Sequence, residues 1–216
     1  MIITLLKHSM LLLLTSFTLI MSSPTFAANE MEQLNTLLAQ TKTLEAHFSQ
    51  VVDGSRMSGS RVYTGKFYME RPSKFRWVVE TPDKQTLVAD GKNLWIYDED
   101  LAQVTVQELN KELGNTPALL LSGEVNAISD AFKVSLGKGT RDAQWFDLTP
   151  RDPSSLIAHV SLGFTQDKVK YMILTDGTGQ TTRLTFTDIV INSALPKTLF
   201  QFTPPEQVDV IGEPQK

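Results

Sequence analysis

Residues 61–97 read RVYTGKFYMERPSKFRWVVETPDKQTLVADGKNLWIY, and apolar side chains recur there at about every second position. Phe67 belongs to one alternating segment, and Phe75 and Trp77 belong to the next. A period of two is typical of strands that bury one face, because successive side chains point to opposite sides of a sheet. The turn at Asp90-Gly91 predicts a hairpin, since glycine adopts the positive φ that tight turns require. The stretch therefore predicts consecutive antiparallel strands with one apolar face.

The same alternation extends to both sides of this stretch and predicts about eleven strands in all. It begins near Leu44 and resumes from Phe132 to Ile191. Strands this regular are expected to form one large curved, mainly antiparallel sheet. We expect a helix from Asn29 to about Lys42, with Asn29 as its N-cap, and a short second helix from Thr116 to Leu121. The segment from Phe200 to Pro205 is expected to leave the sheet as an extended tail.

An apolar run near the N-terminus predicts a cleaved secretory signal peptide over residues 1–27. The run from Met10 to Met21 follows Lys7, and Ala27 fits the cleavage position. A membrane anchor is the alternative, but the run is shorter than the roughly 20 residues that a spanning helix needs. Removal of the signal peptide leaves residues 28–216, which we expect to form a single domain.

The composition excludes several classes of protein and of site. The chain has 216 residues and no cysteine, so disulfides, thiolate metal sites, a cysteine nucleophile and a lipidated cysteine are excluded. A net charge of −4 disfavours binding to nucleic acid. His47 and His159 are expected to be separate surface residues, and no nucleophile motif is present. We therefore expect no enzyme activity, no catalytic residue, no metal site and no cofactor.

A set of apolar residues on the expected helices and strands has two interpretations. The side chains either fill an ordinary core or line a cavity that a wide sheet leaves beneath its helices. Periodicity alone favours the core. The residues of this set are Leu34, Leu38, Phe48, Phe67, Phe75, Trp77, Leu87 and Leu121.

Several short motifs keep the order and spacing found in one known protein family. They are Phe48-Ser-Gln50, Arg71-Pro-Ser-Lys-Phe-Arg-Trp77, Pro82-Asp83, Asp90-Gly91-Lys92, Leu94-Trp95, Gln103-Val-Thr105, Gly114-Asn-Thr-Pro117 and Phe202-Thr-Pro-Pro205. Each motif is weak alone. Together they resemble the outer-membrane lipoprotein carrier proteins of Gram-negative bacteria, over the whole chain beyond the signal peptide.

The resemblance implies a fold and a function. The fold is an incomplete, open β-barrel with an α-helical lid over an apolar cavity. The function is that of a soluble, monomeric periplasmic chaperone that shields the acyl chains of triacylated lipoproteins. Its partners are an ATP-driven lipoprotein-release complex of the inner membrane and a lipoprotein acceptor of the outer membrane. A lipid- or lipoprotein-sensing regulatory protein of the same fold is the alternative.

The resemblance also implies roles for single residues. Arg71 corresponds to an arginine that binds lid-loop carbonyls in the closed state, and Phe75 to an aromatic residue at the cavity mouth that contacts the partners. Without the resemblance, a surface ion pair would be the simpler interpretation of Arg71, and a core position would explain Phe75 equally well. Ala118 stands where the family often has a bulkier residue. The residues implied to line the acyl-chain cavity are Leu34, Leu38, Phe48, Phe67, Trp77, Leu87 and Leu121.

Overall fold

The structure, a computed structural model, describes residues 26–53, 59–109 and 117–215. Most of the described chain forms strands. The strands are β1 Thr43–Val52, β2 Arg61–Glu70, β3 Lys74–Thr81, β4 Gln85–Asp90, β5 Asn93–Asp98, β6 Gln103–Glu108, β7 Phe132–Leu136, β8 Gln144–Pro150, β9 Ile157–Thr165, β10 Lys168–Asp176, β11 Thr181–Ile191 and β12 Asp209–Ile211.

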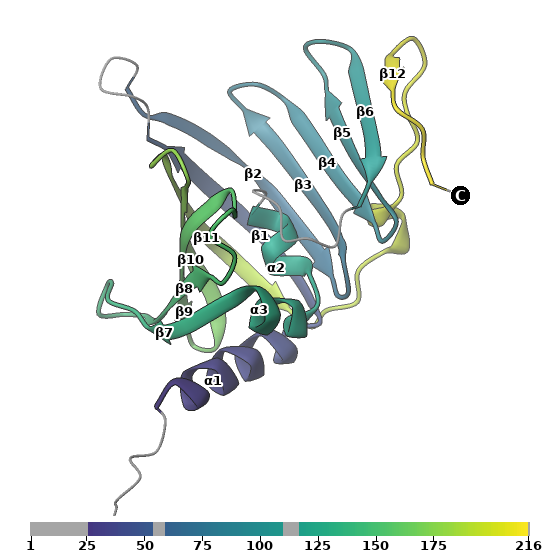
Figure 1. Ribbon diagram of the computed structural model, residues 1–216. Coiled ribbons are helices and arrows are strands. Elements are labelled where there is room, and N and C mark those ends of the chain that lie inside the picture. Colours follow the sequence, from purple (N-terminus) through teal and green to yellow (C-terminus); the bar gives the residue numbers. More distant parts are fainter. Residues whose placement is uncertain (1–25, 54–58, 110–116, 216) are drawn as a thin grey trace, which may run out of the picture.

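The strands form one twelve-stranded sheet that curves around the helices (Figure 1). Their order is β12-β6-β5-β4-β3-β2-β1-β11-β10-β9-β8-β7, so β12 and β7 are the edges and the sheet is not closed. Neighbouring strands are antiparallel except for β12, which runs parallel to β6. The expected large, open and mainly antiparallel sheet is therefore confirmed.

The expected alternation decides which side chains face inward. On β3, Phe75 and Trp77 are buried in the core while their neighbour Arg76 lies on the other face. The predicted hairpin turn lies between β4 and β5, where Gly91 has a φ of 98°. Alternating burial on successive strands gives the sheet a continuous apolar inner face.

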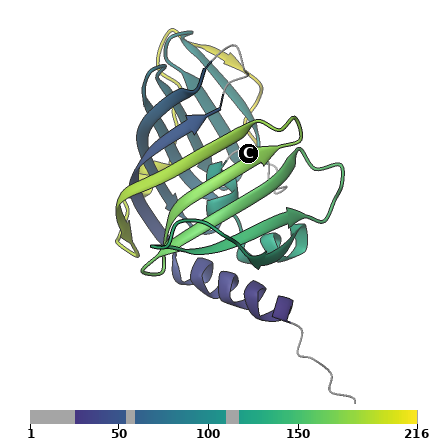
Figure 2. The same ribbon diagram turned by 90° about the vertical axis from the view of Figure 1, so that its left-hand side faces the viewer.

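Within the described ranges, three α-helices and one short 3-10 helix accompany the sheet: α1 Phe26–Gln40, α2 Pro117–Ser122, α3 Val125–Ala131 and η1 Lys197–Phe200. α1 packs against β7 and α3, and α2 packs against β2 and β3. Figure 2 shows α1 crossing the open end of the sheet. Within the described residues, no helix is both long enough and apolar enough to cross a membrane.

One expectation about the helices was wrong, and one helix was missed. α1 begins at Phe26, so Asn29 is inside the helix rather than at its N-cap; Ala27 and Ala28 are strong helix formers and extend it. α3 was not expected, because its seven residues bury only Ile128 and have no side-chain cap. The expected cap at Thr116 lies outside the described residues.

The C-terminal tail does not leave the sheet, contrary to the expectation. Phe202 packs against Trp95 and Tyr97 on the outer face, with ring centroids 5.6 Å and 6.0 Å away. The tail then forms β12 beside β6, which adds a strand to the expected count. Both contacts have a physical cause, since outer-face apolar side chains and the unpaired backbone of an edge strand favour a cover.

Candidate functional site

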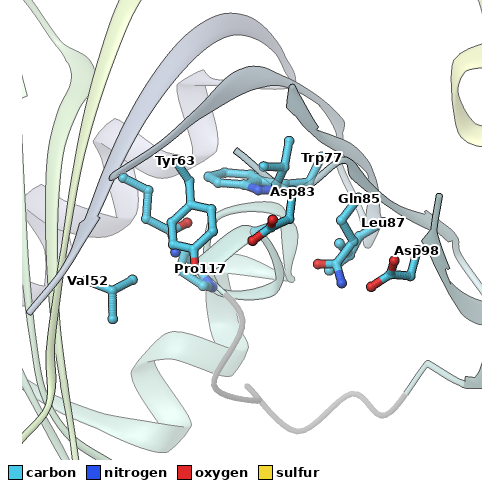
Figure 3. Close-up of a pocket in the computed structure, with 11 residues that line it drawn as sticks. Val52, Tyr63, Trp77, Asp83, Gln85, Leu87, Asp98 and Pro117 are labelled. Atoms are coloured by element: carbon cyan, nitrogen blue, oxygen red, sulfur yellow. The ribbon is translucent and has the colours of Figure 1, made fainter. Parts of the chain in front are cut away.

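A pocket of about 420 Å³ lies between the inner face of the sheet and the first residues of α2 (Figure 3). Five neighbouring strands contribute to it, so it occupies the curved half of the sheet from β1 to β5. Its lining residues are Gln50, Val52, Tyr63, Trp77, Val79, Asp83, Gln85, Leu87, Asp98, Pro117 and Ala118.

The pocket lining is amphipathic. Trp77, Leu87 and Ala118 supply apolar surface from β3, β4 and α2. Asp83, from the turn between β3 and β4, and Asp98, at the end of β5, add carboxylates to the same pocket. Neither carboxylate forms an ion pair within the part of the chain that the structure describes. The pocket thus offers an apolar surface for hydrocarbon and a negatively charged border for polar groups.

Trp77 separates the pocket from a packed aromatic cluster. Its ring stacks on Phe48 at a centroid distance of 3.8 Å and lies 5.2 Å from Phe67. Phe186 meets it edge to face at 6.5 Å. Such pairs stabilise a core beyond the area that they bury. Trp77 therefore belongs to both the stable core and the pocket wall.

The structure brings the predicted cavity residues into one apolar core, but only Trp77 and Leu87 line the pocket. Phe75 has no exposed surface and does not line the pocket. Phe75 therefore lies in the core in this structure, and its role at a cavity mouth stays a prediction. The predicted residues that are buried in the core beside the pocket are Leu34, Leu38, Phe48, Phe67 and Leu121.

Several lining residues were missed by the sequence reasoning, although the period of two points to them. Gln50 and Val52 continue the inward face of Phe48 along β1. Tyr63 stands in the same relation to the inward face of β2, and Gln85 to that of β4. Gln50 and Gln85 were missed because their side chains are polar. Asp98 continues the inward face of Leu94 and Ile96 along β5. Asp83 carries no such signal, because it lies in a turn, where side chains have no fixed period.

Arg71 joins the ends of two helices. It follows β2, and its Nε donates a hydrogen bond to the Thr41 carbonyl, 3.1 Å away, just beyond α1. Its Nη1 donates to the Gly123 carbonyl, just beyond α2. Burial of the guanidinium lowers the pKa of Arg71 to about 10, so the side chain remains charged at neutral pH. One cation thus holds backbone carbonyls from both helix ends.

The backbone of the same turn strengthens this attachment. The Arg71 N–H donates to the Lys42 carbonyl, and the Ser73 N–H donates to the Ser122 carbonyl, both at 2.9 Å. The end of α2 is therefore held through carbonyl oxygens that also bind water well. We call residues 71–73, together with the carbonyls that they bind, the helix clamp.

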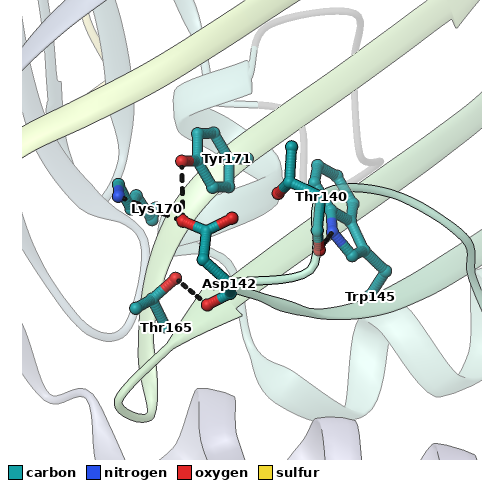
Figure 4. A network of polar contacts seen from close by, with 6 residues as sticks. All are labelled: Thr140, Asp142, Trp145, Thr165, Lys170 and Tyr171. Carbon is teal, nitrogen blue, oxygen red and sulfur yellow. Dashed lines mark hydrogen bonds and ion pairs between the residues drawn. The ribbon is translucent and has the colours of Figure 1, made fainter.

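A separate polar network lies on the other half of the sheet (Figure 4). Asp142 accepts hydrogen bonds from the Tyr171 hydroxyl at 3.1 Å and from Lys170 Nζ at 3.4 Å. Hydrogen bonds from Thr140, Tyr171 and Lys170 lower the pKa of Asp142. Trp145 Nε1 donates to the Thr140 carbonyl at 3.2 Å. These bonds fix the loop between β7 and β8, and none of these residues lines the pocket.

The histidines do not add a chemical site. His47 lies 3.3 Å from Asp188 and His159 lies 3.5 Å from Asp147, and both imidazoles are substantially exposed. The expected separate surface positions are confirmed. No cluster suited to hold a metal ion was found in the described residues.

Comparison with known sequences gives a family model and relatives that carry the same description. The sequence model of the family described as "Outer membrane lipoprotein carrier protein LolA" matches residues 39–203. A Nitrosomonas europaea protein named "Outer-membrane lipoprotein carrier protein" is 38% identical over 187 residues, which cover 86% of this chain and 90% of that protein. A protein of the same name from Pseudomonas aeruginosa PAO1 is 40% identical over 185 residues, covering 84% and 87%.

Comparison with solved structures supports the fold. The crystal structure of an "uncharacterized conserved protein" from Thermus thermophilus superposes with a TM-score of 0.53 at 12% sequence identity. The match covers 87% of this chain and 99% of that chain. At this identity the likeness shows a shared fold and does not indicate a function.

Proposed function

Because the chain belongs to the LolA family of outer-membrane lipoprotein carrier proteins, we propose that it carries lipoproteins through the periplasm with their acyl chains beneath α2. The family is periplasmic, and its members are carriers rather than enzymes. The observation that carries this proposal is the pocket itself, in which Trp77, Leu87 and Ala118 present apolar surface under a helix held by the helix clamp.

The physical need for such a carrier is large. Each acyl methylene exposed to water costs about 0.8 kcal/mol, so a triacylated lipoprotein does not cross an aqueous compartment unaided. The apolar surface of the pocket offsets part of this cost. The lining and the adjoining core would receive the acyl chains through the side chains Leu34, Leu38, Phe48, Phe67, Trp77, Leu87 and Leu121.

The size of the pocket requires the helices to move. A volume of about 420 Å³ is that of a site for one small ligand, not for three acyl chains. In our proposal α2 shifts away from the sheet as cargo enters, and the helix clamp of Arg71 re-forms when the pocket is empty. Arg71 is suited to this exchange, because its bonds go to carbonyls that water can satisfy instead.

The amphipathic lining gives the cargo an orientation. Acyl chains would lie against Trp77 and Leu87, while the peptide that follows the lipidated cysteine would lie at the border with Asp83 and Asp98. This arrangement keeps polar groups out of the apolar core, where they would be costly without partners. It predicts that cargo with basic residues close to the lipidated cysteine binds more tightly than cargo with acidic ones.

Further parts of the proposal concern maturation and partners. Residues 1–27 would be removed as a signal peptide, leaving residues 28–216 as one monomeric domain. Cleavage after Ala27 would shorten α1 only at its beginning. Cargo would come from the inner-membrane ATP-driven release complex and pass to the outer-membrane acceptor. Phe75 would contact these partners only after the structure around it opens, because it is fully buried.

The proposal is tested by release of a radiolabelled lipoprotein from spheroplasts that are incubated with the purified mature protein. We expect a soluble one-to-one complex, and we expect Leu87→Glu, which places a charge on the apolar lining of the pocket, to release less lipoprotein than the wild type. Leu136→Glu is the matched control, since Leu136 is exposed at the end of β7 and does not line the pocket. Recovery of no soluble complex with the wild type would overturn the proposal.

A further inference from the structure

Two serines in the lid helices have opposite surroundings. Ser129 on α3 shares hydrogen bonds with Asn35 of α1, at 2.9 Å and 3.3 Å between side-chain atoms. Ser122, the last residue of α2, has no exposed surface, and its hydroxyl has no hydrogen-bond partner in the described part of the chain. The hydroxyl of Ser129 therefore contributes to holding α3 on α1, while that of Ser122 is buried without a partner among the described residues.

The Ser122 hydroxyl is buried because α2 lies closed against the sheet. Its own carbonyl accepts the Ser73 N–H, and the next carbonyl, of Gly123, accepts Arg71 Nη1. The hydroxyl is thus enclosed when the helix clamp is formed. If α2 moves off the sheet, water satisfies the hydroxyl and its cost disappears. A cost present in only one of two states shifts the equilibrium toward the other.

The neighbouring cation stabilises the closed state only modestly. The guanidinium of Arg71 gains hydrogen bonds in the helix clamp but loses water, and this desolvation is the cause of its lowered pKa. The closed lid therefore contains a bonded but desolvated cation beside a hydroxyl without a partner among the described residues. Apolar contacts of Leu120 and Leu121, which are almost fully buried, hold α2 against both costs.

We propose that Ser122 is a positioning residue that weakens the closed state of α2, so that an acyl chain displaces the helix with little resistance. The inference rests on the proposed carrier function, because it links the free energy of closing α2 to the loading of the pocket with acyl chains. Pro117 and Ala118, at the other end of this helix, line the pocket, so a shift of α2 widens it directly.

The test compares Ser122→Ala with Ser129→Ala, which removes a hydroxyl that has a partner. In the empty protein, hydrogen exchange of the amides of α2 should slow about fivefold to tenfold in Ser122→Ala, whereas Ser129→Ala should accelerate exchange of the amides of α3. Dansyl-undecanoic acid serves as the acyl probe. Its affinity should fall about fivefold to tenfold in Ser122→Ala, because less of the protein is in the binding-competent state.

The outcomes separate this inference from the carrier proposal. Faster α2 exchange or a lower melting temperature in Ser122→Ala would show that the hydroxyl is stabilising, for instance through an ordered water, and would overturn the inference. Slower exchange with unchanged probe affinity would also overturn it, because the lid would not limit loading. Absence of probe binding to the wild type would count against the carrier proposal, while the exchange measurement would still decide the role of Ser122.

Discussion

The two faces of the sheet are covered in different ways. On the inner face, the end of α2 is held through carbonyl oxygens by Arg71 and Ser73, above a pocket. On the outer face, the C-terminal tail adds a strand to β6, and Phe202 packs on two aromatic rings. Arg76 adds a hydrogen bond from its Nη1 to the Leu199 carbonyl at 3.3 Å.

The difference suggests which cover moves. Polar bonds to carbonyls are exchanged for bonds to water at a net cost of about 1 kcal/mol each. Lifting α2 also exposes Leu120 and Leu121, but acyl chains that enter beneath α2 replace their apolar contacts, whereas the strand pairing and aromatic packing of the tail would be lost without replacement. We therefore expect the helices on the inner face to open while the tail stays in place, which gives the carrier a moving lid on a rigid sheet.

The largest expected effect is on stability, and it comes from replacing one tryptophan on each face of the sheet. Trp77→Ala and Trp95→Ala should each lower the free energy of unfolding by about 3–5 kcal/mol, because each removes a large buried side chain. Urea denaturation measures this. Only Trp77→Ala should also reduce uptake of an acyl probe, since Trp95 packs under the tail. Equal loss of uptake in both variants would contradict the assignment of the inner face to cargo.

The next effect concerns the attachment of the tail. Gly212→Ala should destabilise the protein by about 1–3 kcal/mol. Gly212 has a φ of 95°, and a Cβ there would lie 2.1 Å from the Val106 carbonyl oxygen. Gly179→Ala is the control, because Gly179 has a φ of 85° with open space around it and so reports the backbone cost alone. If both variants lose the same stability, the tail is not tightly packed on β6.

A smaller effect is expected when the helix clamp is broken. Arg71→Leu should destabilise the attachment of α2 by about 1 kcal/mol, since the lost charged hydrogen bonds are partly offset by relief of desolvation. Hydrogen exchange at Gly123 should accelerate, and cargo should bind but be delivered slowly to an acceptor. Arg76→Leu should instead accelerate exchange near η1. Normal delivery by Arg71→Leu would refute the role of Arg71 in closing the lid.

The smallest expected effect is a weaker attachment of the C-terminal tail at acidic pH. Burial tends to raise the pKa of Asp90, but hydrogen bonds from Trp95, Asn93 and Lys92 outweigh this and lower it. A carboxyl group whose pKa is depressed in the folded state stabilises the fold at pH values above its ordinary, unfolded-state pKa of about 3.9. This contribution is lost as the pH falls through the folded-state pKa. Asn93 binds the backbone of Gln215 at 2.7 Å and 3.3 Å.

Protection of the Gln215 amide should therefore fall below about pH 4, before that of α2 does. Exchange measured by NMR between about pH 6 and pH 3 tests this order. Asp90→Asn should weaken the tail already at the upper end of this range and remove most of the change with pH. Loss of protection in α2 before Gln215 would contradict the view that this carboxylate supports the tail.

The sheet was predictable because alternation is a local property of the sequence. The period of two placed Phe67, Phe75 and Trp77 on one buried face, as the structure shows. α3 and β12 were not predictable in this way. α3 is too short for a helical period, and β12 is a three-residue strand whose side chains are all exposed. Its pairing depends on an edge that only the assembled sheet provides.

The site was only partly predictable for a related reason. Trp77 and Leu87 were expected to line a cavity, and they line the pocket. Periodicity does not distinguish a side chain that borders a pocket from one that packs, so it did not show that Leu34 and Phe48 lie in the core beside the pocket. The state of Ser122 depends on whether a partner lies within reach in three dimensions, which the sequence does not state.

The central claim is that acyl chains occupy the inner face, and a pair of tyrosines on β2 tests it most directly. Tyr63 lines the pocket, while Tyr68 lies on the outer face opposite Arg76 on the neighbouring strand. Replacing each in turn by the photo-crosslinking residue p-benzoylphenylalanine keeps an aromatic side chain on the same strand. Complexes with a lipoprotein labelled in its acyl chains are then irradiated. We predict crosslinks to the labelled chains from position 63 and none from position 68, and equal crosslinking from both positions, or from position 68 alone, would contradict the account.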